Sequence, residues 1–388
     1  MSKLINKISD RMSNVKPDVL LGFSDSISDV EGLIPLTIGE PDFNTPDHIK
    51  EAAIAAINNN HSHYTDSRGV KELRDAAVKF LADKYDLHYD SETQFIATVG
   101  VTEALFITFG ALLNPGDGVV VPSPAFSPYF NNVEFFGAHS VEVDTSDDGF
   151  VLTPEKLEAA IKEHPTIKIV IINTPNNPTG VSYTSEQLKG LADVIKKHDL
   201  VCFSDEIYSE LTYDQEHASI AKFIPERTIV FNGLSKSHAM TGWRVGLVYG
   251  PEEIIHTARS IHEYTATSLP GVVQYAAVEA LTNGKDDGLE MRKVYEKRRN
   301  LLRQGLADAG IESANPSGAF YIFGKIPEKF GDDDFEFCRR VAREAKVGTM
   351  PGSAFGKSGK GYFRLSYATS EDNLNEAVKR IAKFVEDN

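Results

Sequence analysis

Short, continuously apolar segments alternate with helix signals through the middle of this 388-residue chain, and this alternation constrains the fold more than any other feature. Continuous apolar runs of four to eight residues are typical of strands buried on both faces, as in a parallel sheet covered by helices. We therefore predict an α/β fold with strands at 95–99, 118–121, 167–172, 201–203, 229–231 and 246–249.

Hydroxyl side chains precede three amphipathic runs and predict helix starts at Thr45, Thr153 and Thr184. Proline follows Thr45 and Thr153, at the first helical position that it favours. From about residue 283 the pattern changes to a long charged helix through 303, a segment at 318–324, a helix at 333–345, an alternating strand at 362–367 and a closing helix at 375–385. We predict a large domain over 46–285, and a smaller α+β domain formed by 286–388 with an N-terminal arm, residues 1–45.

Composition excludes several classes of protein. A net charge of -16 argues against broad nucleic-acid binding, which needs clustered lysine and arginine. Basic residues do cluster over 292–303, but at helical spacing among acids and leucines, so we predict a solvated helix face. No apolar run approaches the length of a membrane span, and the first residues lack the apolar core of a signal peptide. Cys202 and Cys338 form no CxxC motif, so we expect a cytoplasmic protein in a reducing compartment.

Polar residues follow three of the predicted strands closely. Asn177, Asp205 and Lys236 come just past their C-terminal ends. Ligands of open α/β sheets bind at this edge. An amide, an acid and a lysine together suit a pyridine ring that bears an aldehyde and a phenolic oxygen, so the three strand ends predict a site for pyridoxal 5'-phosphate.

Lys236 and Asp205 each have a structural alternative. A lone lysine is normally a surface charge, but Lys236 follows an apolar strand and a glycine, where burial would lower its pKa and leave the neutral amine that attacks an aldehyde. Asp205 is either a helix N-cap or the partner of a protonated pyridine nitrogen. Tyr208, three residues on, and Asn177 could both reach the phenolic oxygen of the ring.

A phosphate needs backbone N–H groups at a helix start and a cation. Gly100, Val101 and Thr102 join a predicted strand to a helix, although a plain strand–helix turn capped by threonine explains them equally well. Arg244 is the predicted cation, and Ser235 could add a hydroxyl group.

Phe126 and Arg364 complete the set of candidates. Phe126 follows another strand end, where it either stacks on the pyridine ring or belongs to the core. Arg364 alternates with the apolar residues of its strand, so it is either a surface arginine or a planar fork for a carboxylate.

Seven segments of the chain resemble the class I/II aminotransferases of pyridoxal-phosphate fold type I, in family order and at family spacing. They are I-G-E-P-D-F-N-T-P (38–46), Y-T-D-S-R-G-V-K-E-L-R (64–74), N-T-P-N-N-P-T-G (173–180), S-D-E-I-Y (204–208), S-K-S-H-A-M-T-G-W-R-V-G (235–246), S-G-A-F-Y (317–321) and R-L-S-Y-A (364–368). The resemblance implies a large, mostly parallel seven-stranded sheet between helices and a smaller α+β domain.

The resemblance also implies roles for individual residues. Lys236 would bind the coenzyme aldehyde, Asp205 its ring nitrogen, and Asn177 and Tyr208 its phenolic oxygen. The phosphate would be held by Val101, Thr102, Ser235 and Arg244. Gly39, Asn177 and Arg364 would bind the substrate α-carboxylate, and Tyr64 would reach the phosphate of a partner subunit, which implies a homodimer with shared active sites.

The implied reaction moves an amino group from an L-amino acid to a 2-oxo acid such as 2-oxoglutarate in a ping-pong cycle. Thr102 and Tyr264 stand where dicarboxylate-specific relatives carry a cation, so we expect an aromatic or other large side chain rather than aspartate. Phe23, Phe126, Tyr264 and Phe355 could surround that side chain or belong to the core or an interface.

Several alternatives stay open or are disfavoured. The coenzyme could serve an aspartate or N-acetyl-diaminopimelate aminotransferase, or a β-lyase that cleaves C–S bonds. A coenzyme-binding transcription regulator would need a DNA-binding domain, yet only about 35 residues precede the motifs. A Rossmann dehydrogenase would need G-x-G-x-x-G after an early strand, and the sequence lacks it.

Overall fold

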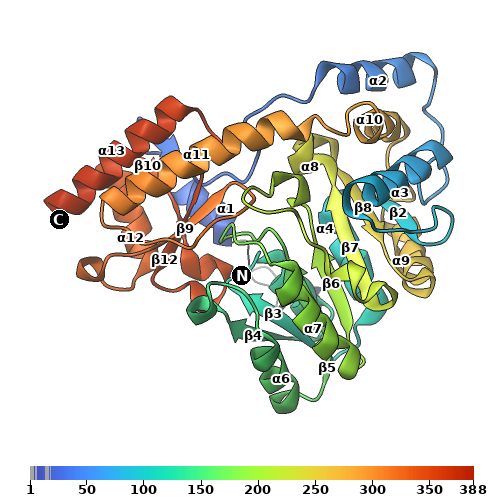
Figure 1. The fold of residues 1–388 in the computed structure, drawn as a ribbon, viewed down its shortest axis with the longest axis horizontal. Helices are drawn as coiled ribbons and strands as arrows, with labels where there is room; N and C mark the ends of the chain where they lie inside the picture. The colour runs from blue at the N-terminus through green and yellow to red at the C-terminus, as the bar shows by residue number, and fades with distance from the viewer. Residues whose placement is uncertain (1–3, 5–6, 14–16, 18) are drawn as a thin grey trace.

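The computed structural model describes residues 4, 7–13, 17 and 19–388, and its main feature is a seven-stranded sheet between helices (Figure 1). The strands follow the order β2 (Phe95–Val99), β8 (Val245–Tyr249), β7 (Thr228–Gly233), β6 (Val201–Asp205), β5 (Ile167–Asn173), β3 (Gly118–Ser123) and β4 (His139–Asp144). All run in one direction except β8, which is antiparallel to both neighbours. The predicted α/β class is confirmed.

The six apolar segments all form strands of this sheet, whereas β4 was missed. This strand lies at the sheet edge, and Val141 is its one buried residue. Because an edge strand is partly exposed, its sequence mixes polar with apolar residues and lacks the run that marks the other strands.

Helices cover both faces of the sheet because successive strand residues point to opposite sides. Val119 and Val121 of β3 pack in one apolar cluster with α4 (Gly100–Leu112), α5 (Pro128–Phe135) and α9 (Glu252–Thr265). Val120, between them, belongs to a second cluster with α6 (Pro154–Glu163) and α7 (Ser185–Lys197). The β2–β8 end is covered by α3 (Lys71–Tyr85) and α10 (Gly271–Leu281).

Two of the three predicted caps are present. Thr153 accepts a hydrogen bond from the Lys156 backbone, and Thr184 forms a capping box with Gln187. The prediction at Thr45 is wrong: α2 (Asp47–Asn58) begins after Pro46 and has no side-chain cap. The Thr45 hydroxyl instead donates to the Ala239 carbonyl at 2.7 Å, because a tertiary contact competes for it.

The other elements gather to the left of the large sheet in Figure 1. A three-stranded antiparallel sheet has the order β11 (Met350–Pro351), β12 (Tyr362–Ser366) and β9 (Tyr321–Lys325). Its flanking helices are α11 (Gly288–Asp308), α12 (Asp334–Arg340) and α13 (Glu371–Asp387). Near the chain start, β1 (Ile34–Pro35) follows α1 (Val19–Ser26) and pairs in parallel with β10 (Val347–Gly348), so this segment joins the C-terminal elements.

The basic cluster on α11 is only partly a solvated face, which corrects the prediction. Arg298 is buried and donates to Asp42 Oδ1 at 2.8 Å. Arg299 is also buried, and its guanidinium contacts Asp214 Oδ1 at 2.9 Å. Periodicity could not reveal this burial because both acids lie outside the helix.

Within the described ranges, no helix combines the length and apolar character needed to cross a bilayer. Residues 1–3 and 5–6, part of the segment used in the signal-peptide prediction, lie outside the described residues. Cys202 and Cys338 are buried and free.

Candidate active site

Three adjacent parallel strands deliver polar side chains to one edge of the large sheet. β5, β6 and β7 are neighbours, with Asn173 opposite Asp205 and Asp205 opposite Phe231. The short helix α8 (Leu234–Ser237) begins directly after β7 and carries Lys236. The loop after β5 carries Asn177. The three predicted strand-end residues therefore lie at the same edge, where parallel strands of an α/β sheet place ligand sites.

Lys236 is a half-buried amine with an altered pKa. Its Nζ donates to the Gly39 carbonyl oxygen at 2.6 Å. Burial, with repulsion from Arg244 and Arg364, lowers its pKa to about 8, although Glu40 and Asp205 oppose the shift. About one tenth of such an amine is neutral at pH 7, far more than for an ordinary lysine. The Lys236 amine can therefore act as a nucleophile and as a carrier of protons.

Asp205 is the last residue of β6, and its side chain is buried. Its Oδ2 accepts a 2.6 Å hydrogen bond from the Tyr129 hydroxyl, and its Oδ1 accepts from the Ile207 backbone at 3.2 Å. Burial raises the pKa of Asp205 to about 6, against the lowering effect of both hydrogen bonds. The carboxylate is thus ionised at neutral pH and can pair with a buried cation. No α-helix starts here, so the N-cap interpretation is wrong.

Tyr129 is a site residue that the sequence analysis missed. It lies on α5, three residues after Phe126, and its side chain is 1% exposed. The ring of half-buried Phe126 packs edge-on against it, with 5.7 Å between ring centroids. The S-P-A-F-S-P-Y segment after β3 is the signal that could have found it, since a second aromatic follows the same strand end.

Arg364 is buried on β12, so the surface interpretation is wrong. Its Nη1 donates to Asn177 Oδ1 at 2.9 Å, and its Nη2 donates to the Thr37 carbonyl at 2.7 Å. The guanidinium carbon lies 4.4 Å from the ring centroid of Tyr321 and 4.8 Å from that of Phe355. Burial lowers the pKa of Arg364 from its ordinary value, but a guanidinium stays charged. An oriented guanidinium of this kind suits a carboxylate.

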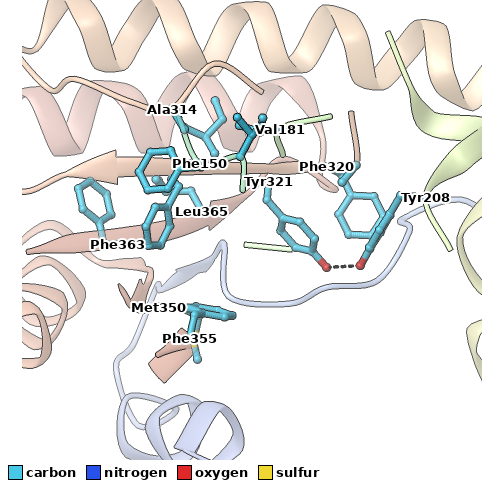
Figure 2. Packing of buried hydrophobic residues seen from close by; sticks show 14 of the residues in the cluster. Phe150, Val181, Tyr208, Ala314, Phe320, Tyr321, Met350, Phe355, Phe363 and Leu365 are labelled. Atoms are coloured by element: carbon cyan, nitrogen blue, oxygen red, sulfur yellow. Dashed lines mark hydrogen bonds between the residues drawn. The ribbon is translucent and has the colours of Figure 1, made fainter. Parts of the chain in front are cut away.

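Tyr208 follows Asp205 in a turn and is buried near Lys236. Lys236 Nζ lies 5.9 Å from the centroid of its ring. The Tyr208 hydroxyl lies 2.9 Å from the Tyr321 hydroxyl, as Figure 2 shows. Tyr321 received no role in the sequence analysis, although the S-G-A-F-Y segment contains it, because no local pattern indicates that its side chain reaches Tyr208.

The start of α4 has the character of an anion site. Gly100, Val101 and Thr102 are its first residues, and such N–H groups have no acceptor within a helix. A Cβ atom at Gly100 would lie 2.4 Å from Arg244 Nη2, so the guanidinium packs directly against this glycine. Thr102 does not cap the helix: the N-cap is Val99, whose N–H donates to Glu103 Oε2 at 2.5 Å. Ser235 is buried on α8, next to Lys236 in sequence.

Tyr64 lies apart from these residues within one chain. Its side chain is 87% exposed, and it lines a cavity of about 610 Å³ with residues 61–63, 266 and 268–272. Within the described part of the chain, Tyr64 makes no hydrogen bond to another predicted site residue.

The four aromatic residues suggested for a substrate pocket do not all lie beside the candidate site. Phe355 lies against Arg364, and its carbonyl accepts from the Ala125 N–H at 2.7 Å, next to Phe126. Phe23 packs on Phe335, and Tyr264 is 93% exposed at the end of α9.

The fold and this site define an α/β enzyme of the pyridoxal-phosphate type, and comparison with known proteins gives its family. The family model of class I and II aminotransferases matches residues 31–381. A probable N-acetyl-LL-diaminopimelate aminotransferase of Bacillus subtilis is 43% identical over 94% of this chain and 92% of its own. Aromatic-amino-acid aminotransferase 2 of Thermococcus litoralis is 39% identical over 98% of both.

Solved structures agree with this assignment. Aspartate aminotransferase from Thermus thermophilus with maleate superposes with a TM-score of 0.92, at 40% identity over 97% of this chain and 99% of that one. An aromatic aminotransferase from Pyrococcus horikoshii has a TM-score of 0.89, at 39% identity over 94% and 99%. The chain belongs to the class I and II aminotransferases, which are pyridoxal-phosphate-dependent enzymes.

The residues present fit this coenzyme. The glycine start of α4 and the guanidinium of Arg244 suit the phosphate. Buried, ionised Asp205 suits a protonated ring nitrogen, and the low pKa of Lys236 suits its aldehyde.

Proposed function

We propose that this aminotransferase moves the amino group of an L-amino acid with an aromatic or other large side chain to a 2-oxo acid such as 2-oxoglutarate, in a ping-pong cycle. The observation that carries the proposal is the convergence of Lys236, with its pKa near 8, Asp205 and the Arg364–Asn177 pair at one edge of the sheet. An amine, an acid and a carboxylate-binding fork are the groups that transamination requires.

Each group has a defined task in the proposed reaction. The coenzyme, when bound, supplies an aldehyde and a ring that withdraws electrons. Lys236 would hold that aldehyde, and its Nζ would take and return the substrate α-proton. Asp205 would hold the proton of the ring nitrogen by charge attraction. Asn177 and Tyr208 would donate to the phenolic oxygen.

Binding groups surround these residues. Arg364 would bind the substrate α-carboxylate, with Gly39 and Asn177 beside it. Val101, Thr102, Ser235 and Arg244 would hold the phosphate, and the ring of Phe126 would cover one face of the coenzyme. Support comes from the packing of Arg244 on Gly100 and of Phe126 on Tyr129.

The preference for a large side chain is supported by the lack of a cation at two positions. Thr102 is exposed in the first turn of α4, and exposed Tyr264 lies in the last turn of α9. Phe355 also presents an apolar ring to the carboxylate fork. Its carbonyl accepts from the Ala125 N–H, next to Phe126 in sequence. Relatives named as N-acetyl-LL-diaminopimelate and aspartate aminotransferases favour a second candidate, an amino acid with a distal polar group.

We also propose that two copies share their active sites, with Tyr64 reaching the phosphate of the partner. The exposure of Tyr64 and the cavity beside it support this arrangement. The division into a large domain, 46–285, and a smaller domain, 1–45 with 286–388, is supported by the pairing of β1 with β10. A cytoplasmic location is proposed from the free cysteines.

The test is a panel of amino donors with 2-oxoglutarate, scored by glutamate formation. Phenylalanine, tyrosine and other large donors should exceed aspartate in kcat/KM by at least about tenfold, the size of one well-filled apolar contact. A preference for aspartate or N-acetyl-diaminopimelate would replace the proposed substrate class. Release of pyruvate and ammonia from cystathionine, without glutamate, would instead indicate the β-lyase.

A further inference from the structure

Tyr321 contacts three residues to which the proposed function assigns roles. It is the first residue of β9, and its side chain is 1% exposed. Its hydroxyl lies 2.9 Å from the Tyr208 hydroxyl, and its ring lies 4.4 Å from the guanidinium carbon of Arg364. A Cβ atom at Gly39 would lie 2.4 Å from the Tyr321 hydroxyl oxygen, so the backbone at Gly39 packs against this hydroxyl.

We propose that Tyr321 is a positioning residue of the catalytic site, with two separable parts. Its hydroxyl group orients and polarises the Tyr208 hydroxyl, and its ring face fixes the Arg364 guanidinium for the substrate carboxylate. The inference rests on the proposed function, because it acts through Tyr208 and Arg364.

The role of the Tyr321 hydroxyl follows from the number of protons that each tyrosine hydroxyl can donate. A tyrosine hydroxyl has one proton to donate, so a Tyr208 that donates to the phenolic oxygen of the coenzyme has only lone pairs left for other partners. The Tyr321 hydroxyl, at 2.9 Å, is placed to donate to one of them. Both side chains are buried, and hydrogen bonds in such a chain strengthen one another in a low-dielectric setting. Tyr321 therefore makes Tyr208 a stronger donor.

The role of the Tyr321 ring follows from the surroundings of Arg364. Asn177 and Thr37 occupy its two terminal nitrogens, but its Nε is buried and has no hydrogen-bond partner among the described residues. The rings of Tyr321 and Phe355 lie against the guanidinium. Figure 2 labels both side chains beside the small sheet. A cation on an aromatic face gains electrostatic attraction, so the Tyr321 ring limits rotation of the fork.

Two variants separate the role of the Tyr321 hydroxyl from that of its ring. Tyr321→Phe removes only the hydroxyl, and we expect the pH midpoint of the visible absorbance of the bound coenzyme to rise by about half to one unit, the size of one hydrogen bond. Its KM for the amino donor should change by less than about twofold, because the ring remains. Tyr321→Leu should shift the midpoint equally and also raise KM by about five- to tenfold, the size of a buried cation–π contact.

The matched control is Tyr367→Phe, which removes another fully buried hydroxyl whose partner is the Ala319 carbonyl at 3.2 Å. It should leave the midpoint unchanged. The decisive comparison places Tyr321→Phe in a Tyr208→Phe background. The midpoint shift should vanish there, because the Tyr208 hydroxyl through which Tyr321 acts is already absent.

An unshifted midpoint in Tyr321→Phe, or an equal shift in Tyr367→Phe, would overturn the inference. Because the midpoint is a property of the bound coenzyme, it is measured without turnover. A wild-type protein that fails to transaminate would therefore defeat the proposed function and leave this test standing. If Tyr321→Leu does not fold, Tyr321→Phe and its double-mutant cycle still decide the matter.

Discussion

Lys236 Nζ donates a 2.6 Å hydrogen bond to the carbonyl oxygen of Gly39, a residue 197 positions earlier in the chain. Two residues before Gly39, the Thr37 carbonyl accepts from Arg364 Nη2 at 2.7 Å. This segment therefore contacts both Lys236 and Arg364. Glu40 extends this segment and accepts a hydrogen bond from the Thr241 hydroxyl, close to Arg244 in sequence.

The altered pKa of Lys236 predicts the pH dependence of coenzyme uptake. Burial lowers this pKa from 10.5 to about 8, so most of the amine is neutral above pH 8. Below pH 8 the neutral fraction falls about tenfold for each pH unit. The rate at which the coenzyme-free protein takes up pyridoxal phosphate should therefore rise with pH and level off above about 8. Stopped-flow absorbance measures this rate. An uptake rate that still rises steeply at pH 10 would show that the fold does not lower the pKa of this lysine.

Replacement of the amine should remove turnover. Lys236→Ala deletes the group that binds the aldehyde and moves the α-proton, and we expect no measurable transamination and loss of the visible absorbance of the bound coenzyme. The control is Lys222→Ala, at an exposed lysine, which should behave as the wild type. Normal turnover by Lys236→Ala would defeat the assignment.

Asp205→Ala should lower kcat by about 10²-fold or more, because a preorganised charge at the reacting ring is lost. The fold should stay intact, as judged by circular dichroism, since the variant also relieves the cost of burying an anion next to Glu206. Rates near those of the wild type would remove Asp205 from the mechanism.

Tyr129→Phe should move the acid limb of the activity profile to higher pH. The Tyr129 hydrogen bond lowers the pKa of Asp205, so its loss must raise that pKa further above its value of about 6. Activity that needs the Asp205 anion then declines at a higher pH than in the wild type. The measurement is kcat/KM between pH 5 and 8, and an acid limb that stays in place or moves downward would contradict the prediction.

Glu206→Gln should destabilise the protein by about 2–4 kcal/mol. The carboxylate is fully buried, and its Oε1 accepts from the hydroxyls of Ser204 and Ser219, each at 2.6 Å. Its Oε2 lies 2.9 Å from His217 Nε2. Glutamine replaces one of the two carboxylate oxygens with an amide nitrogen, which cannot accept a hydrogen bond at that position. Urea unfolding measures the change, with exposed Glu226→Gln as the control. Equal stability of the two variants would show that this network contributes little.

Local patterns predicted most of the large sheet. The segment 95–99 forms β2 with the same bounds, because a strand buried on both faces needs a continuous apolar run. Edge strand β4 has no such run and was missed. The Thr184 capping box was predictable because its partner is three residues away, whereas the role of Thr45 depends on Ala239, which is distant in sequence.

The sequence by itself determined six of the seven strands of the large sheet. It also determined the convergence of Asn177, Asp205 and Lys236, because parallel strands carry whatever follows them to one common edge. Tertiary structure alone decided that Tyr129 meets Asp205 and that Tyr321 meets Tyr208, across 76 and 113 residues of sequence. Periodicity reports which face of an element is buried, but not which side chain lies opposite. That pairing depends on how whole elements pack, so it becomes visible only once the chain is folded.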